Sequence, residues 1–281
     1  MKVTKASLVM SVCLLIGCFG CSIIKPNPDP EKPDLTIQDH RASFLFDKAG
    51  TRVMNILAHN LDDNHFNNVY NKCKANGDKV IYLYVGYNNG DGPGTTSIYV
   101  DDKFGNTIDE NKVNSMKNRM KKIRDDKLYI VGWLFADDNT KKVNFKDTAA
   151  LKNYIKAVVD RFDSYISEYV IGIEVDEYLS SAQVNELAAY IKGLTNKSIA
   201  SHQVPGKYNY STSGNISKHY HQYGFNKSTS YIESETKKII AALGKPVIGA
   251  EYDMSSDSSG AKARGDAVIR GGGSGTGNGR N

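Results

Sequence analysis

Acidic side chains end two strand-like segments of the sequence, YVIGIEVDEY (169–178) and KPVIGAEYD (245–253). Each segment is apolar or β-branched until its last residues. The acidic residues at the two ends are Glu174, Asp176, Glu177, Glu251 and Asp253. A carboxylate at the end of a buried strand is costly to desolvate, and two carboxyls that face one cleft can cut a glycosidic bond. The pattern therefore predicts a pair of catalytic carboxyls that acts on a glycoside.

The roles of the carboxyls follow from the chemistry of that bond. An ionised Glu251 would attack the anomeric carbon, while a protonated Glu177 would donate to the leaving oxygen and then activate water. Side chains 174 and 176 share one face of a strand and 177 takes the other, so alternation leaves Glu174 open as the acid. A structural ion pair with a lysine is the alternative for Glu174. A carboxyl separation of about 5 to 5.5 Å would predict retention, and about 6.5 to 9.5 Å inversion.

A second set of polar and aromatic side chains lies in or just beyond the predicted strands. Rings there could stack on sugar faces, and the polar groups could bind hydroxyls. The candidates for substrate binding are Asp176, His202, His221, Tyr223, Trp133, Tyr252 and Asp253. Packing in the core is the alternative for the aromatic rings and for the two histidines. The six histidines form no HExxH motif, and no helix follows the glycine-rich segment 273–279, so we predict neither a metal nor another cofactor.

The elements that must position these side chains alternate between strand-like runs and segments of helical period. This alternation favours parallel strands connected through helices. The predicted strands are residues 52–60, 79–87, 128–138, 169–178, 198–204, 219–225, 245–253 and 273–279. Eight strands in about 245 residues predict an α/β fold, a single-domain (β/α)8 TIM barrel whose functional face is the carboxyl end of the strands. The alternative, an open doubly wound sheet, lacks a glycine-rich phosphate loop after the first strand.

The N-terminus predicts the compartment. Lys2 and Lys5 precede an apolar run at residues 8–16, and Gly17 precedes Cys18, as in a bacterial lipoprotein signal peptide. Residues 1–17 would be removed and Cys18 would carry the lipid, with Cys21 as the weaker alternative site and a secreted soluble protein as the alternative fate.

The segments after the leader complete the predicted organisation. Residues 18–36 are rich in proline and charge and predict a lipidated tether, and residues 37–281 form the barrel domain. We therefore expect a protein that is lipid-anchored to the membrane of the bacterial cell envelope and faces the periplasm or the exterior.

The charge of the chain argues against nucleic acid as a partner. The formal net charge of +5 falls to +3 without the leader, which carries two lysines and no acidic residue. The remaining lysines alternate with acidic residues along predicted helices, which is typical of a solvated helix face. The expected partners are an oligo- or polysaccharide substrate and, through the N-terminal lipid, the membrane.

Three short motifs resemble the retaining glycoside hydrolases of the (β/α)8-barrel clan that includes cellulases, mannanases and β-galactosidases. That clan places an asparagine–glutamate pair, with the acid/base glutamate, at the end of strand four, where Asp176–Glu177 stands here. Its nucleophile ends strand seven, which the segment around Glu251 resembles. His221 and Tyr223 resemble the histidine and tyrosine that brace the nucleophile, so Tyr223 is expected to hydrogen-bond Glu251.

The resemblance implies a membrane-anchored hydrolase that cleaves β-glycosidic bonds through two glutamates with retention. The alternative is a non-catalytic barrel lipoprotein that binds carbohydrate or another surface ligand.

Overall fold

A computed structural model of the protein describes residues 40–43, 53–88, 94–136, 142–224, 227–252 and 258–278. The predicted signal peptide, the lipidation site Cys18, the tether and the candidate binding residue Asp253 lie outside these ranges and stay predictions.

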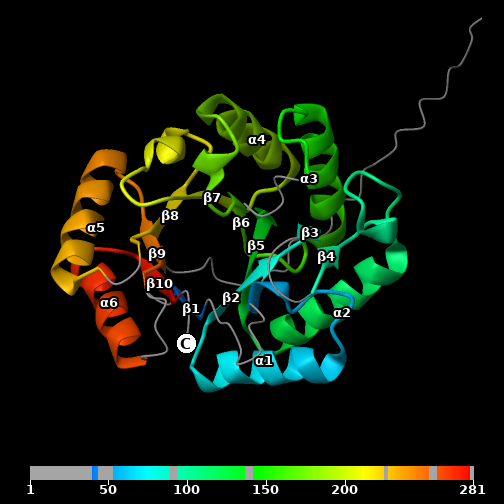
Figure 1. Cartoon of the computed structure of the whole chain (residues 1–281), viewed down its shortest axis with the longest axis horizontal. Helices are drawn as coiled ribbons and strands as arrows, with labels where there is room; N and C mark the ends of the chain where they lie inside the picture. Colours follow the sequence, from blue (N-terminus) through cyan, green and yellow to red (C-terminus); the bar gives the residue numbers. More distant parts are fainter. Residues whose placement is uncertain are drawn as a thin grey trace, which may run out of the picture. The chain divides into compact units, whose positions relative to one another are not determined.

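Eight parallel strands form a closed barrel in which each strand pairs with the barrel strands before and after it in the chain (Figure 1). The barrel strands are β1 (His40–Ser43), β2 (Val80–Tyr84), β5 (Tyr129–Phe135), β6 (Glu168–Gly172), β7 (Ser198–Gln203), β8 (Lys218–Gln222), β9 (Val247–Glu251) and β10 (Gly275–Asn278). The last strand pairs with the first, with Gly275 opposite His40, which closes the barrel. The predicted α/β fold, a (β/α)8 barrel, is confirmed.

Helices connect most of the strands and surround the barrel (Figure 1). They are α1 (Asp63–Ala75), α2 (Glu110–Asp125), α3 (Thr148–Phe162), α4 (Ser181–Leu194), α5 (Thr229–Leu243) and α6 (Ser258–Arg270). Between β7 and β8, where the sequence also shows no convincing helix, lies only the short 3-10 helix η6 (Asn209–Thr212). Among the helices of the described ranges, none is long and apolar enough to cross a membrane.

Local sequence accounts for where the helices begin and end. Five helices start after a side chain that accepts a hydrogen bond from the first turn, which satisfies one of its unpaired N–H groups. These capping residues are Asp62, Asp109, Asp147, Ser180 and Ser228. Gly244 ends α5 in the left-handed conformation, at φ 61°, because glycine adopts that conformation without steric penalty.

The predicted first strand, residues 52–60, is wrong. The segment contains the 3-10 helix η2 (Val53–Asn55) and turns, and the true first strand, β1, lies earlier in the chain. The carbonyls of Ile56 and Ala58 accept hydrogen bonds from the Arg119 guanidinium on α2, at 3.0 and 2.8 Å. These buried backbone groups are therefore satisfied by a distant side chain and need no partner strand.

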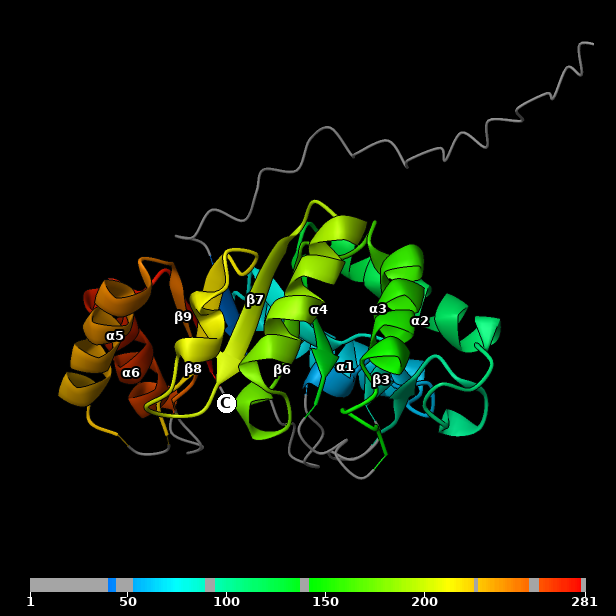
Figure 2. The same cartoon turned by 90° about the horizontal axis from the view of Figure 1, so that it is seen from above.

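The protein has one hydrophobic core inside the barrel and another between the barrel and its helices. The inner core includes Tyr82, Trp133 and Tyr220, whose ring centroids lie 5.4 to 5.7 Å apart. Outside the barrel, α5 and α6 lie side by side in both views (Figures 1 and 2). Tyr223 and Tyr252 pack against residues of these two helices. Strand alternation therefore decides which side chains can reach the barrel mouth.

Candidate active site

Glu251 reaches the inside of the barrel through an irregularity in β9. His221 of β8 pairs with Gly249, but the next residue, Gln222, pairs with Glu251, so Ala250 is an extra residue on β9. An extra residue of this kind is a β-bulge, and it re-aims the side chains that follow it. Without it, Glu251 would share the outward face of Gly249. The bulge places the Glu251 carboxylate beside the Gln222 side chain at the carboxyl end of the strands.

Glu174 lies in a strained turn directly after β6. Its backbone adopts φ 45° and ψ 44°, in the left-handed region, and it begins the 3-10 helix η5 (Val175–Glu177). A non-glycine residue there costs on the order of 1 to 2 kcal/mol. The Tyr178 hydroxyl donates to the Ile173 carbonyl at 2.6 Å and holds the turn against the end of the strand. Strained residues of this kind cluster at functional sites.

A single amide joins the two carboxylates. The Gln222 Nε2 atom donates to Glu174 Oε1 at 2.5 Å and to Glu251 Oε2 at 3.0 Å. Because both contacts share one nitrogen, the two oxygens lie at most 5.5 Å apart (2.5 plus 3.0 Å). The structure thus brings together side chains from β8, β9 and the turn after β6.

His202 of β7 completes the group, and its proton can be located. Its Nδ1 accepts a hydrogen bond from the backbone N–H of Glu174 at 2.9 Å, so the proton lies on Nε2. Burial, and to a lesser degree the nearby His221, lowers the pKa of His202 to about 3, so the ring is neutral. The Nε2 atom has no hydrogen-bond partner among the described residues and faces Glu251 Oε2 at 3.7 Å.

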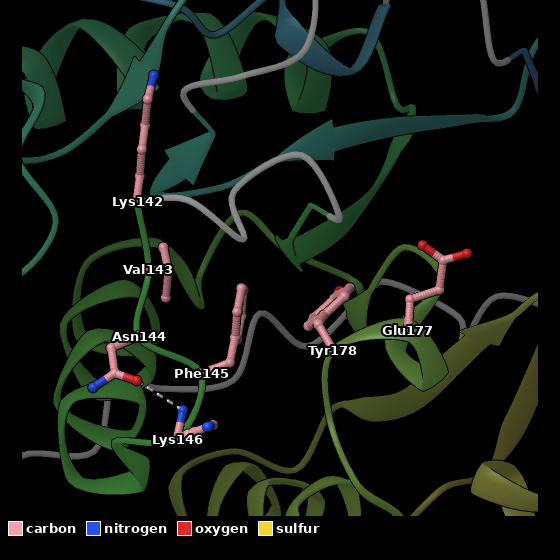
Figure 3. A pocket seen from close by; sticks show the side chains of 7 residues that line it. All are labelled: Lys142, Val143, Asn144, Phe145, Lys146, Glu177 and Tyr178. Atoms are coloured by element: carbon pink, nitrogen blue, oxygen red, sulfur yellow. Dashed lines mark hydrogen bonds between the residues drawn. The ribbon is translucent and has the colours of Figure 1, made fainter.

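Glu177 does not join Glu251. It is exposed on η5, and its carboxylate makes no hydrogen bond or ion pair with any described residue. With Tyr178 and residues 142–146 it lines a surface pocket, in which the Phe145 and Tyr178 rings lie 4.4 Å apart (Figure 3). In that view the Glu177 carboxylate points away from the Tyr178 ring. The expected pairing of Glu177 with Glu251 is replaced by the pairing of Glu174 with Glu251.

Asp176 is enclosed by protein. Its side chain has no exposed surface, and it accepts a hydrogen bond from the Val204 backbone at 3.3 Å and pairs with Lys207 at 3.2 Å. These contacts join η5 to the segment after β7. Asp176 therefore holds the turn that carries Glu174, and it is not placed to bind a sugar as the sequence suggested.

Trp133 supports the site from below. The side chain is fully buried inside the barrel, and its ring meets the His202 ring edge-on at a centroid distance of 5.4 Å. A ring with no exposed face cannot stack on a sugar, so Trp133 is not placed to bind substrate as the sequence suggested. Trp133 instead fixes the position of His202.

The predicted brace of Glu251 by His221 and Tyr223 is wrong. Both side chains face outward, because the inward positions of β8 are those of Tyr220 and Gln222. The Tyr223 hydroxyl hydrogen-bonds Thr236 of α5 at 2.6 Å.

His221 packs against Tyr223 outside the barrel, and its Nε2 atom has no hydrogen-bond partner among the described residues. His221 Nδ1 lies 2.9 Å from His219 Nε2, and burial lowers the pKa of His221 to about 3. Tyr252 is also buried outside the barrel, in the cluster with Tyr223.

Gln222 is the site residue that the sequence reasoning missed. It stands two positions after the buried Tyr220, and strand alternation assigns both to one face. That two-residue spacing from a buried strand residue is the sequence signal that indicates an inward-facing Gln222. Within the described ranges, no group of three or more histidine, cysteine, aspartate or glutamate residues could hold a metal ion.

Comparisons with known proteins extend the description of the fold. No protein-family model matches the sequence, and no curated protein matches it significantly. A family 5 mannosidase from Rhizomucor miehei superimposes with a TM-score of 0.63 at 11% identity, over 86% of this chain and 80% of that protein. An endo-β-1,4-mannanase from Thermotoga petrophila gives a TM-score of 0.59 at 12% identity, over 88% and 68%.

This chain matches a third solved structure over a smaller part of that protein's length. A family 5 glycoside hydrolase from Bacteroides vulgatus gives a TM-score of 0.57 at 15% identity over 78% of this chain. The chain spans 54% of that protein, about half its length. At these identities the likeness shows the fold, a (β/α)8 barrel of the kind found in glycoside hydrolases.

Proposed function

We propose that the protein is a glycoside hydrolase whose two catalytic carboxyls are Glu174 and Glu251. One observation carries the proposal: the ends of the fourth and seventh barrel strands, β6 and β9, present two carboxyls joined by the Gln222 amide. Glycosidases place two carboxyls on either side of the bond that they cut. The two oxygens bonded to the amide lie at most 5.5 Å apart (2.5 plus 3.0 Å), which is below the separation of about 6.5 to 9.5 Å of inverting enzymes and favours retention.

The arrangement assigns a role to each carboxyl. Glu251 would attack the anomeric carbon as the bond to the leaving oxygen breaks, and Glu174 would pass its proton to that oxygen. Water would then attack the glycosyl–Glu251 ester and return a proton to Glu174. The assignment follows the resemblance, in which the nucleophile ends the seventh strand, because Glu251 ends β9, the seventh strand of this barrel.

The proposed substrate is an oligo- or polysaccharide with β-linkages. β-1,4-Mannan is the first to test, because two of the structures that share the fold are described as a mannosidase and a mannanase. Lipid attachment at Cys18 would hold the enzyme at the membrane of the cell envelope, where such polymers are accessible.

The decisive experiment measures reducing-sugar release by the purified protein from mannans, glucans, xylans and aryl β-glycosides. Glu174→Gln and Glu251→Gln are each expected to lower kcat/KM at least about 100-fold, because each removes a group that acts in the transition state. Glu177→Gln is the matched control, since it makes the same change on an exposed carboxyl of the same turn. It is expected to retain activity.

Two results would contradict the proposal. If Glu177→Gln abolished turnover and Glu174→Gln did not, the assignment of the acid/base would be wrong. If the wild-type protein bound glycans but cleaved none of them, the non-catalytic binding barrel would take the place of the hydrolase. In an active enzyme, NMR of the first-formed product is expected to show the β anomer.

A further inference from the structure

The Gln222 side chain occupies an unusual position between two acidic groups. The side chain is 8% exposed and belongs to β8. It contacts Glu251 of β9 and Glu174 of the turn after β6 through one nitrogen. A glutamine amide carries two N–H hydrogens. The contacts of 2.5 and 3.0 Å use one hydrogen each, so the amide nitrogen is fully committed to Glu174 and Glu251.

This geometry addresses a physical difficulty of the site. Two carboxylates at this separation repel each other, and in a site shielded from water the repulsion favours protonation of one of them. A neutral donor between them offsets the repulsion for both carboxylates. Because it adds no positive charge, one carboxyl can still be protonated while the other stays ionised. A lysine in the same place would keep both carboxyls ionised and remove the acid.

Two other donors of the described barrel interior make different contacts. His202 of β7 faces Glu251 Oε2 with its Nε2 atom, but at 3.7 Å the contact is longer than a hydrogen bond. Deeper in the barrel, Glu168 of β6 is paired with Lys218 of β8 and also accepts a hydrogen bond from Tyr220.

We propose that Gln222 is a positioning residue that holds one oxygen of each carboxyl and directs the opposite oxygen of each toward the reacting bond. This inference rests on the proposed function and deepens it. A carboxylic acid accepts hydrogen bonds best at its carbonyl oxygen, so the contact at Glu174 Oε1 places the transferable proton on Oε2. Gln222 thereby sets both the distance between the carboxyls and the atom that carries the proton.

The test replaces the amide with an apolar group of similar length, Gln222→Met. Both carboxyls then lose a donor that favours their charged forms, so the pKa of each rises. Both limbs of the pH profile of kcat/KM are expected to move to higher pH, by about one unit, with a fall in kcat. A variant that merely weakened the fold would lower the activity at every pH and leave the limbs in place.

Gln203→Met is the matched control. Gln203 is a buried glutamine at the end of the neighbouring strand β7, and its Oε1 accepts a hydrogen bond from the Tyr210 backbone at 3.1 Å. It faces away from the barrel interior, since His202 faces inward. The control variant is expected to keep the wild-type pH profile. Gln222→Asn, which keeps the amide but is one methylene shorter, provides a second test if Gln222→Met does not fold.

A measurement without turnover separates this inference from the proposed function. The side-chain carboxyls are labelled with ¹³C-glutamate and titrated by NMR in the unliganded protein, and resonances are assigned with Glu174→Gln and Glu251→Gln. Upward shifts of both titrations in Gln222→Met would support the positioning role, even if the wild-type protein cleaved no glycan. Unchanged titrations in Gln222→Met and Gln222→Asn, with unchanged pH limbs where activity is measurable, would overturn it.

Discussion

Glu174 combines two features that a purely structural residue would avoid. Its φ of 45° is unfavourable for any side chain, and its carboxylate shares a hydrogen-bond donor with Glu251. The backbone strain lowers the stability of the fold, and the closeness of the two carboxylates is repulsive, so both features are expected to be retained for function. At the scale of the residue, stability and activity therefore oppose each other at this position.

Substitutions at Glu174 separate the backbone strain from the charge. Both Glu174→Gly and Glu174→Ala remove the carboxylate, but only glycine relieves the left-handed backbone. We expect the glycine variant to be the more stable of the two by about 1 kcal/mol in urea unfolding, the reverse of the usual order. Both variants are expected to lack glycosidase activity. An alanine variant as stable as the glycine variant would show that the turn is not strained.

The turn between β6 and η5 is the element that places the proposed acid. Gly172 ends the strand, and a Cβ atom there would lie 2.4 Å from the Tyr178 hydroxyl oxygen and 2.9 Å from the Phe135 carbonyl oxygen. The absence of a side chain lets Tyr178 fold back onto the strand and bond the Ile173 carbonyl. The turn aims Glu174 inward and leaves Glu177 exposed.

Gly172→Ala tests this element. The added methyl group must displace Tyr178 or the backbone, so we expect a loss of about 1 to 3 kcal/mol in the free energy of unfolding. We also expect a larger loss of kcat than of substrate affinity, because Glu174 moves. Gly193→Ala in α4 is the control: a Cβ there meets nothing within 4 Å, and alanine should stabilise the helix by about 0.5 to 1 kcal/mol. Unimpaired activity in Gly172→Ala would contradict the role of the turn.

At the scale of the whole molecule, the closed barrel buries histidines on both sides of its wall. His202 faces the interior and His221 faces outward, and burial lowers the pKa of each to about 3. Burial also holds the pKa of His219 well below its usual range. The folded state therefore stays neutral at these positions while the unfolded chain takes up protons below about pH 6.5.

This difference predicts how stability depends on pH. Between about pH 6.5 and 3 the unfolded state binds more protons at His202 and His221 than the folded state, so stability falls as the pH falls. Each buried histidine contributes a slope on the order of 1.4 kcal/mol per pH unit. Urea unfolding at pH 6.5 and pH 5 measures the slope. His221→Gln is expected to reduce the slope of the unfolding free energy against pH by the contribution of one buried histidine. Equal slopes in variant and wild type would contradict the low pKa of His221 in the folded state.

Part of this architecture could be predicted from the sequence because it depends on neighbours along the chain. Strand and helix periods alternate, Ser180 caps α4, Gly244 ends α5, and acidic residues follow the fourth and seventh barrel strands. The prediction failed at residues 52–60, where a side chain remote in sequence, Arg119, satisfies the backbone. Such a contact leaves no mark in the local pattern.

The sequence by itself determined seven of the eight barrel strands and the carboxyls at their ends, since periodicity and capping are local properties of the chain. Only the tertiary structure decided which carboxyls meet. The extra residue Ala250 reverses the side of β9 on which the Glu251 carboxylate emerges, and the left-handed turn at Glu174 ends the extended strand before Asp176 and Glu177. The Gln222 side chain hydrogen-bonds two partners, Glu174 and Glu251, that are 48 and 29 residues away along the chain. The direction of a side chain at the end of a strand is set by the register between strands, and register exists only in the folded barrel.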